Sequence, residues 1–225
     1  MSDGVMIVGI PGIGKSELAS QYSYKYGNEY DHIIFTNGDS IEASLQDIAK
    51  ILQLSNLTNI NVIVKLLEEY FRNEKILFVY DNVTDTNKLA TVLIRDFDNI
   101  VTTQIQNWGA YYEKIVIDVW TESQALQYVA TSILNKHEQG NLKYLAEKLG
   151  YHPLAIEHAI SFIKQSAITL QEYFEFLQSN ELQVLSEKIT LDQSGIKTSI
   201  FTPFLLTIQK LQKEDISAFF CKGIL

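Results

Sequence analysis

The segment GIPGIGKS, residues 9–16, has the residue types and the spacing of a loop that binds phosphate. Two glycines flank four residues, and a lysine and a serine follow directly, between a short apolar run and a segment with helical spacing. Glycine lets backbone N–H groups approach an anion closely, and the N-terminus of the following helix points at its negative charge. We therefore expect Lys15 to reach the β- and γ-phosphates of a nucleotide and Ser16 to bind Mg²⁺.

The predicted contact with the nucleotide covers the whole loop and the residue after it. Its members are Gly9, Ile10, Pro11, Gly12, Ile13, Gly14, Lys15, Ser16 and Glu17.

A second part of such a site is an acidic residue at the end of another buried strand, where it holds the metal and its water shell. Asp81 ends the apolar run ILFVYD and is the predicted metal-binding carboxylate, about 65 residues after the loop. The next residue, where many ATPases of this kind have a second carboxylate, is Asn82. An amide can position a water but cannot act as a base, so Asp81 and Asn82 as the catalytic pair predict slow turnover or none.

Short apolar runs that alternate with amphipathic segments must position these residues. The runs that predict strands are residues 5–8, 32–36, 75–81, 99–103 and 114–119. Amphipathic segments at 40–53 and 60–72 predict helices, the first with Ser40 as its cap. This alternation predicts an α/β domain over residues 1–120, with a parallel sheet covered by helices on both faces.

Beyond residue 120 the pattern indicates helices alone, and we expect a helical subdomain over residues 121–180. Two capping boxes, a helix-ending glycine and a helix-starting proline mark its helices. These signals are Thr121 with Gln124, Thr169 with Glu172, Gly150, and Pro153.

Composition limits the classes of function. The net charge is −9, which argues against a broad basic surface for nucleic acid. The chain has one cysteine, Cys221, and no apolar run approaches the roughly 18 residues of a membrane span. We expect a soluble, cytoplasmic protein without membrane contact.

Four segments, in order along the chain, resemble the motifs of the NB-ARC group of signal-transduction ATPases, the STAND class of P-loop NTPases. They are similar to its Walker A, Walker B, sensor and Gly-Leu-Pro-Leu-Ala segments, and read IVGIPGIGKSELA, ILFVYDNVTD, NIVTTQIQNWG and LGYHPLAIEHAI. The resemblance implies ATP or ADP as ligand, with Mg²⁺ at Ser16 and Asp81 and with Pro153 packed on the adenine. It also implies a P-loop α/β domain, then a helical bundle, then the start of a winged-helix subdomain over residues 181–225.

The sequence departs from that family at two motifs. Gln104 stands where the family usually has the sensor arginine that reads the γ-phosphate, and glutamine can donate a hydrogen bond but carries no charge. The Met-His-Asp motif of the winged helix does not occur before Leu225, so the resemblance implies only a partial winged-helix subdomain.

Slow chemistry at a strong nucleotide site favours a molecular switch, whose output is a contact with protein partners or self-association. Two alternatives stay open. One is a catalytically active ATPase or small-molecule kinase, which the scarcity of arginine disfavours, since Arg72 and Arg95 are the only two. The other is a module that holds ADP permanently as a structural ligand.

Overall fold

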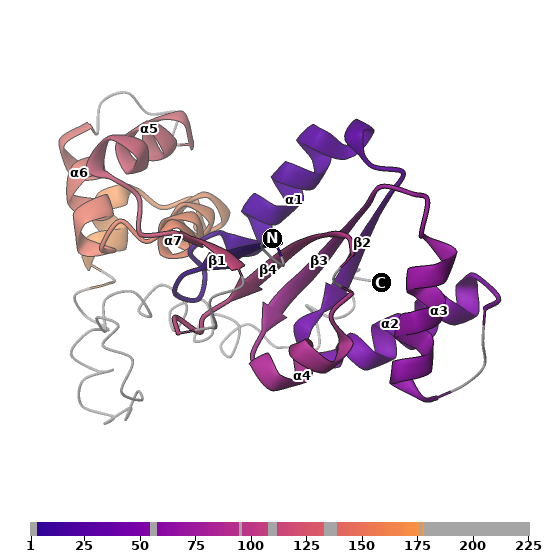
Figure 1. Ribbon diagram of the computed structural model, residues 1–225. Helices are drawn as coiled ribbons and strands as arrows, with labels where there is room; N and C mark the ends of the chain where they lie inside the picture. Colours follow the sequence, from indigo (N-terminus) through magenta and orange to yellow (C-terminus); the bar gives the residue numbers. More distant parts are fainter. Residues whose placement is uncertain are drawn as a thin grey trace, which may run out of the picture. The chain divides into compact units, whose positions relative to one another are not determined.

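A computed structural model describes residues 4–54, 58–94, 96–107, 112–132, 139–175 and 177. The chain divides into two compact units, Met1–Asp118 and Val119–Leu225. The first unit carries the strands, and the described elements of the second are helices (Figure 1).

The first unit is built on a five-stranded sheet in which every pairing is parallel, with strand order β2-β3-β4-β1-β5. The strands are β1 (Gly4–Val8), β2 (His32–Asn37), β3 (Ile76–Val83), β4 (Asp98–Thr103) and β5 (Tyr112–Val116). In a parallel sheet the carboxyl ends of all strands lie at one edge. The ends of β1, β3 and β4, which carry the predicted site residues, are therefore brought together by the fold.

Helices cover both faces of this sheet, so the predicted α/β architecture is confirmed (Figure 1). The helices and 3₁₀ turns of this unit are α1 (Lys15–Tyr26), η1 (Gly27–Glu29), η2 (Gly38–Ser40), α2 (Ile41–Ile51), α3 (Ile60–Tyr70) and α4 (Thr86–Val92). Successive side chains of β3 point to opposite faces of the sheet and therefore pack into two separate cores. Phe78 and Tyr80 pack into the core with α2, α3 and α4, whereas Leu77 and Val79 pack with Ala19 of α1.

The structure differs from the local expectations for this unit at three points. β5 begins two residues before the run 114–119 and ends three residues before it does, because this edge strand is largely exposed and its pattern is not set by burial. The seven-residue helix α4 was not predicted, since it buries only Leu89 and Val92. Ser40 lies directly before α2, at the capping position, but its side chain makes no capping hydrogen bond. The turn η2 runs directly into α2, and the Asn37 side chain caps that turn by accepting from the Asp39 N–H.

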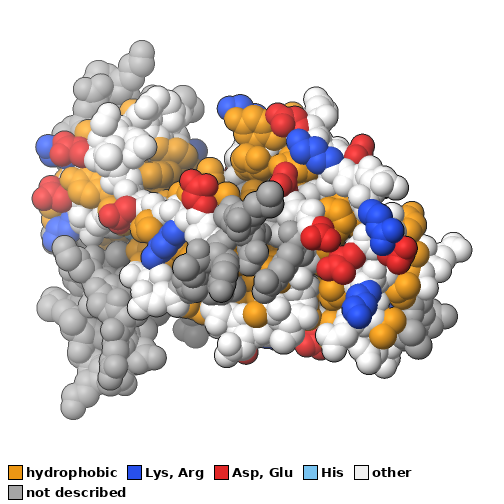
Figure 2. Space-filling model, in the orientation of Figure 1, with side chains coloured by type: hydrophobic (Ala, Val, Ile, Leu, Met, Phe, Trp, Pro, Cys, Tyr) orange, Lys and Arg blue, Asp and Glu red, His pale blue; other side chains and the backbone are white. Residues whose placement is uncertain are grey.

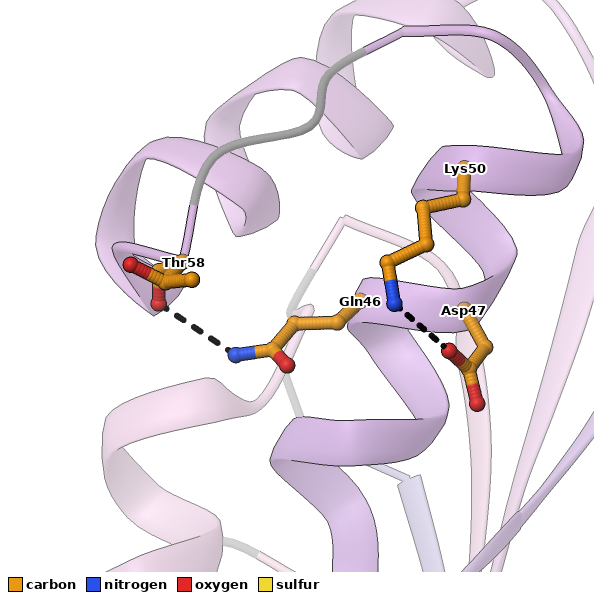
Figure 3. Close-up of polar contacts among 4 residues, drawn as sticks. All are labelled: Gln46, Asp47, Lys50 and Thr58. Atoms are coloured by element: carbon orange, nitrogen blue, oxygen red, sulfur yellow. Dashed lines mark hydrogen bonds and ion pairs between the residues drawn. The ribbon is translucent and has the colours of Figure 1, made fainter.

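A side chain of α2 makes a hydrogen bond to the backbone just before α3 (Figure 3). Gln46 Nε2 donates to the Thr58 carbonyl over 3.3 Å, across to the backbone that precedes α3. Lys50 instead pairs with Asp47 of its own helix at 3.1 Å. Both groups of that ion pair are exposed, so it contributes at most about 1 kcal/mol to stability.

The second unit contains α5 (Glu122–Ser132), α6 (Gln139–Lys148) and α7 (Pro153–Ser166), followed by a helical segment at 170–175. Its core includes Val129, Leu145, Ala146, Ile156, Ile160 and Tyr173. Both capping boxes form as predicted, Gly150 ends α6 with φ 60°, and Pro153 is the first residue of α7. The predicted winged-helix segment 181–225 lies outside the described residues.

Charged side chains of both signs are interspersed on the face drawn in Figure 2. Within the described ranges, no helix combines the length and the apolar character needed to cross a membrane.

Candidate nucleotide-binding site

The predicted phosphate-binding loop lies between the end of β1 and the first turn of α1. Gly12 has φ 70° and Gly14 has φ 104°, in a backbone region that a residue with a Cβ adopts only at a cost in free energy. Gly14 precedes α1, and its carbonyl accepts a hydrogen bond from the Leu18 N–H over 2.9 Å. Ile13 is buried and anchors the loop. The first turn of a helix has N–H groups without partners inside the helix, so this geometry suits an anion.

Lys15 is folded back onto the loop. Its Nζ donates to the carbonyls of Gly9 at 3.0 Å and Ile10 at 2.9 Å, and the residue is only 8% exposed. Burial lowers the pKa of Lys15 from its ordinary value, and the nearby carboxylate of Asp81 opposes that effect. The ammonium therefore lies within the loop, where a bound phosphate could replace the two carbonyls as its partner.

Asp81 meets two hydroxyl groups at the edge of the sheet. Ser16 Oγ donates to Asp81 Oδ1 over 2.7 Å, and Thr102 Oγ1 donates to the same oxygen over 2.6 Å. The three residues come from α1, β3 and β4, and the parallel sheet brings them together. A hydroxyl and a carboxylate are hard oxygen groups of the kind that Mg²⁺ prefers, with substrate phosphates supplying further ligands. Ser16 and Asp81 therefore fit a magnesium ion bound together with a nucleotide.

Asn82 and Gln104 are exposed residues at the same edge of the sheet. Asn82 has φ 58° and lies in an irregularity of β3, between the paired positions Tyr80 and Val83. Asparagine is one of the few residues with a side chain that adopts this conformation readily. Gln104 directly follows β4. Each amide is thus placed beside the site, and its catalytic or sensing role stays a prediction.

The two remaining predicted residues are placed differently. Glu17 is exposed in the first turn of α1, where its carboxylate accepts from Gln21 Nε2 over 2.8 Å along the helix. Pro153 begins α7 in the second unit, and its contact with adenine stays a prediction.

Thr102 was not identified from the sequence, although it contacts Asp81 directly. The signal was the pair of threonines that ends β4, one strand away from both the loop and Asp81. The contact arises because β3 and β4 are parallel neighbours in the sheet, so that residues 21 positions apart in the chain meet at the ends of the two strands.

No family model matches the chain. Among curated proteins, it is 24% identical over 252 aligned residues to a nucleotide-binding leucine-rich repeat (NLR)-like protein of Hyaloscypha variabilis. That alignment covers 94% of this chain but 26% of the relative, so the chain spans about a quarter of the relative's length.

Solved structures are similar at low sequence identity. A Walker-type ATPase of Pyrococcus abyssi has a TM-score of 0.55 at 10% identity, covering 83% of this chain and 69% of that one. DnaA of Aquifex aeolicus bound to AMPPCP has a TM-score of 0.55 at 12% identity, covering 95% and 73%. The chain has the α/β P-loop NTPase fold.

A third solved structure is also similar in fold. It is a STAND protein with a tetratricopeptide repeat sensor from Pyrococcus horikoshii. Its TM-score is 0.51 at 18% identity, and the match covers 93% of this chain and 37% of the Pyrococcus protein. The NLR-like relative agrees with the resemblance to the NB-ARC and STAND P-loop NTPases that the four sequence motifs carry, and the Pyrococcus horikoshii protein shares the fold.

Proposed function

We propose that this chain is the nucleotide-dependent switch module of a STAND signalling protein, which binds ATP or ADP with Mg²⁺ and hydrolyses ATP slowly or not at all. The observation that carries the proposal is the cluster of Lys15, Ser16 and Asp81 beside a helix N-terminus. In that cluster a buried ammonium, a hydroxyl and a carboxylate occupy adjoining positions. These are the groups that hold phosphates and a divalent cation in P-loop proteins.

Each residue of the cluster has a separate role. Lys15 would exchange its two carbonyl partners for oxygens of the β- and γ-phosphates, and the loop N–H groups would bind the same phosphates. Ser16 and Asp81 would hold the magnesium ion, which supplies neutralisation of the phosphate charge when it is bound.

Slow chemistry is supported by the two amide residues that follow Asp81 on β3 and Thr103 on β4. Asn82 cannot take a proton from an attacking water, and Gln104 cannot offer a positive charge to the γ-phosphate. A site of this kind binds nucleotide more effectively than it hydrolyses it, which suits a switch whose conformation depends on the phosphate state.

The wider biology follows from the resemblance and is part of the proposal. Adenine would pack on Pro153, and partners or further copies of the protein would bind in one nucleotide state. The Aquifex structure holds an ATP analogue, which supports adenine nucleotide as the ligand here. The Hyaloscypha relative is named as nucleotide-binding, and the Pyrococcus horikoshii protein as a signal-transduction ATPase. A cytoplasmic location would suit such a protein.

The test is to purify the chain, denature it and identify any released nucleotide by chromatography, together with melting curves in Mg-ATP and Mg-ADP. Ligand at 100 times its dissociation constant stabilises the folded state by about 2.7 kcal/mol. Lys15→Met should lose both the bound nucleotide and this stabilisation. Lys25→Met, which removes an exposed lysine at the other end of α1, is the matched control and should keep both.

Four outcomes separate the alternatives. Slow exchange between ADP and ATP with a turnover far below about 1 s⁻¹ supports the switch, whereas turnover in the ordinary range of enzymes contradicts it. Stoichiometric ADP that never exchanges favours a structural ligand. If neither nucleotide shifts the melting temperature, the proposed site does not bind nucleotide.

A further inference from the structure

We infer that Thr102 is a positioning residue for the metal site: its hydroxyl fixes the orientation of the Asp81 carboxylate and so sets how strongly Mg²⁺ increases the affinity for ATP. This inference rests on the proposed function. It names a residue to which the sequence motifs gave no role.

The hydrogen bonds around Thr102 can be arranged in only one way. The Asn82 backbone N–H can only donate, and it donates to Thr102 Oγ1 over 2.8 Å. The single hydroxyl proton of Thr102 is therefore left for Asp81 Oδ1, at 2.6 Å. Asp81 Oδ1 is therefore held by a hydroxyl that is itself held by the backbone N–H of the next residue.

The surroundings make this arrangement rigid. Thr102 has no exposed surface, and a β-branched side chain has few rotamers, so its hydroxyl has little freedom to turn away. Its backbone is paired in the middle of the sheet, where β4 lies between β3 and β1. Asp81 itself is half-buried at the end of β3. A rigid donor therefore holds a carboxylate that would otherwise rotate about its side-chain bonds.

The hydrogen bonds also distinguish the two carboxylate oxygens of Asp81. Within the part of the chain that the structure describes, both hydrogen bonds to this carboxylate end on Oδ1, from Ser16 and Thr102. When Ser16 turns its oxygen to a magnesium ion, Thr102 would remain as the donor that keeps Oδ1 in place. Oδ2 would then be left to serve the magnesium ion. Groups that orient metal-binding side chains in this way typically change metal affinity by about 10- to 100-fold when they are lost.

The neighbouring Thr103 shows that contact with Asp81 is particular to Thr102. Thr103 has the same hydroxyl and the same full burial, but its Oγ1 donates to the Val83 carbonyl over 2.7 Å and accepts from the Ile105 N–H. The Thr103 hydroxyl therefore connects two backbone groups, whereas the Thr102 hydroxyl connects a backbone N–H to a predicted metal ligand.

The test compares Thr102→Val with Thr36→Val. Thr36 is also buried, and its hydroxyl donates from β2 to the Val79 carbonyl of β3 over 3.2 Å, so its loss removes a comparable hydrogen bond between strands without touching Asp81. ATP affinity is measured for the wild type and each variant in EDTA and across a titration with Mg²⁺, alongside melting temperature without nucleotide. Thr102→Ser keeps the hydroxyl, and Thr102→Ala removes it without placing a methyl group against the carboxylate.

The expected result is a loss of about 10- to 100-fold in apparent Mg²⁺ affinity for Thr102→Val and Thr102→Ala, with ATP affinity in EDTA unchanged. Thr102→Ser and Thr36→Val should stay within about threefold of the wild type, since neither removes the hydroxyl donor to Asp81. The inference is overturned if both hydroxyl-free variants keep the wild-type response to Mg²⁺. It is also overturned if Thr36→Val loses as much of that response. Failure of the proposed function would instead appear in the wild type, which would bind no ATP in either condition.

Discussion

A Cβ placed on Gly38 would lie 2.6 Å from both the carbonyl carbon and the carbonyl oxygen of Asn82. Gly38 opens the turn η2 after β2, and Asn82 lies in the irregular end of β3, where the backbone also carries Asp81. Because Gly38 has no side chain, the backbone at the end of β3 can pass this close to the turn η2. The end of β3 that carries Asp81 is supported from β2 by this close approach and from β4 by Thr102 and Thr103.

Gly38→Ala should destabilise the protein and disturb the end of β3. At 2.6 Å the contact is with backbone, which cannot rotate aside as a flexible side chain could. We expect a loss of about 1–3 kcal/mol in the free energy of unfolding, the usual cost of overpacking. Urea denaturation of the nucleotide-free chain measures it, and a loss of Mg²⁺-dependent ATP binding should accompany it.

Gly27→Ala is the matched control for this substitution. A Cβ on Gly27 would meet only the end of the Ile33 side chain at 3.7 Å, an ordinary contact, and Gly27 has φ −57°. Its replacement should leave stability unchanged or raise it by up to about 1 kcal/mol. Equal destabilisation by both substitutions would mean that the backbone contact at Asn82 is not the cause.

Lys15→Met should leave the nucleotide-free protein as stable as the wild type or more stable, while abolishing stabilisation by ATP. The pKa of Lys15 is lowered by burial, which means that the folded loop disfavours its charge relative to the unfolded chain. Methionine fills a similar volume without a buried charge. Urea denaturation with and without Mg-ATP separates the two effects, and a loss above about 1 kcal/mol without nucleotide would contradict this account.

The difference in stability between the wild type and Lys15→Met should depend on pH. Between the lowered pKa of Lys15 in the folded state and its ordinary value, the unfolded chain binds more protons than the folded one. The wild type should therefore gain stability relative to Lys15→Met as the pH rises through that window. Measuring the difference between the two proteins at several alkaline pH values cancels the titration of other groups.

Hydrophobic spacing predicted most elements of the fold, because burial on one face or on both imposes a period on the chain. It worked for Ile76 to Tyr80, which are buried on both faces of the interior strand β3. It failed for β5, where Glu113 and Lys114 lie in an exposed edge strand. It also failed for α4, which is too short to show a period.

The candidate site divides in the same way between local and non-local information. Lys15 and Ser16 could be predicted because their spacing from Gly9 and Gly14 is a property of one loop. Thr102 was missed because its contact with Asp81 depends on which strands are neighbours in the sheet, and a motif read along the chain does not contain that order.

His152 should stabilise the second unit through the start of α7. Its Nδ1 accepts from the Ala155 N–H over 3.3 Å, and the residue is buried directly before Pro153. Replacing it with leucine keeps apolar volume but removes the acceptor, and should cost about 0.5–2 kcal/mol of unfolding free energy. Asparagine, which is a good capping residue, should recover part of this loss, and thermal unfolding of the three proteins measures it. Equal stability of the leucine and wild-type proteins would assign His152 no capping role.

The two capping boxes of the second unit should respond differently to acid. Thr169 donates to Glu172 through its backbone N–H at 2.7 Å and through its hydroxyl at 2.8 Å, and these hydrogen bonds, the backbone one first, hold the pKa of Glu172 below its ordinary value. The charged form is favoured in the folded state, so the contribution of this cap is complete above the ordinary pKa of glutamate. It is lost as the pH falls through the lowered one.

Glu172→Gln should remove this dependence while keeping the cap. Thr121 and Gln124 already form the same box with an uncharged partner, at 2.9 Å from the Thr121 N–H to Gln124 Oε1, and serve as the internal control. In an NMR titration the amide shift of Thr169 should follow an acidic transition that is absent at Thr121 and absent at both positions in Glu172→Gln. A transition at Thr121 of the same size would instead indicate acid unfolding of the whole unit. In the wild type, only a change confined to Thr169 reports the carboxylate of Glu172.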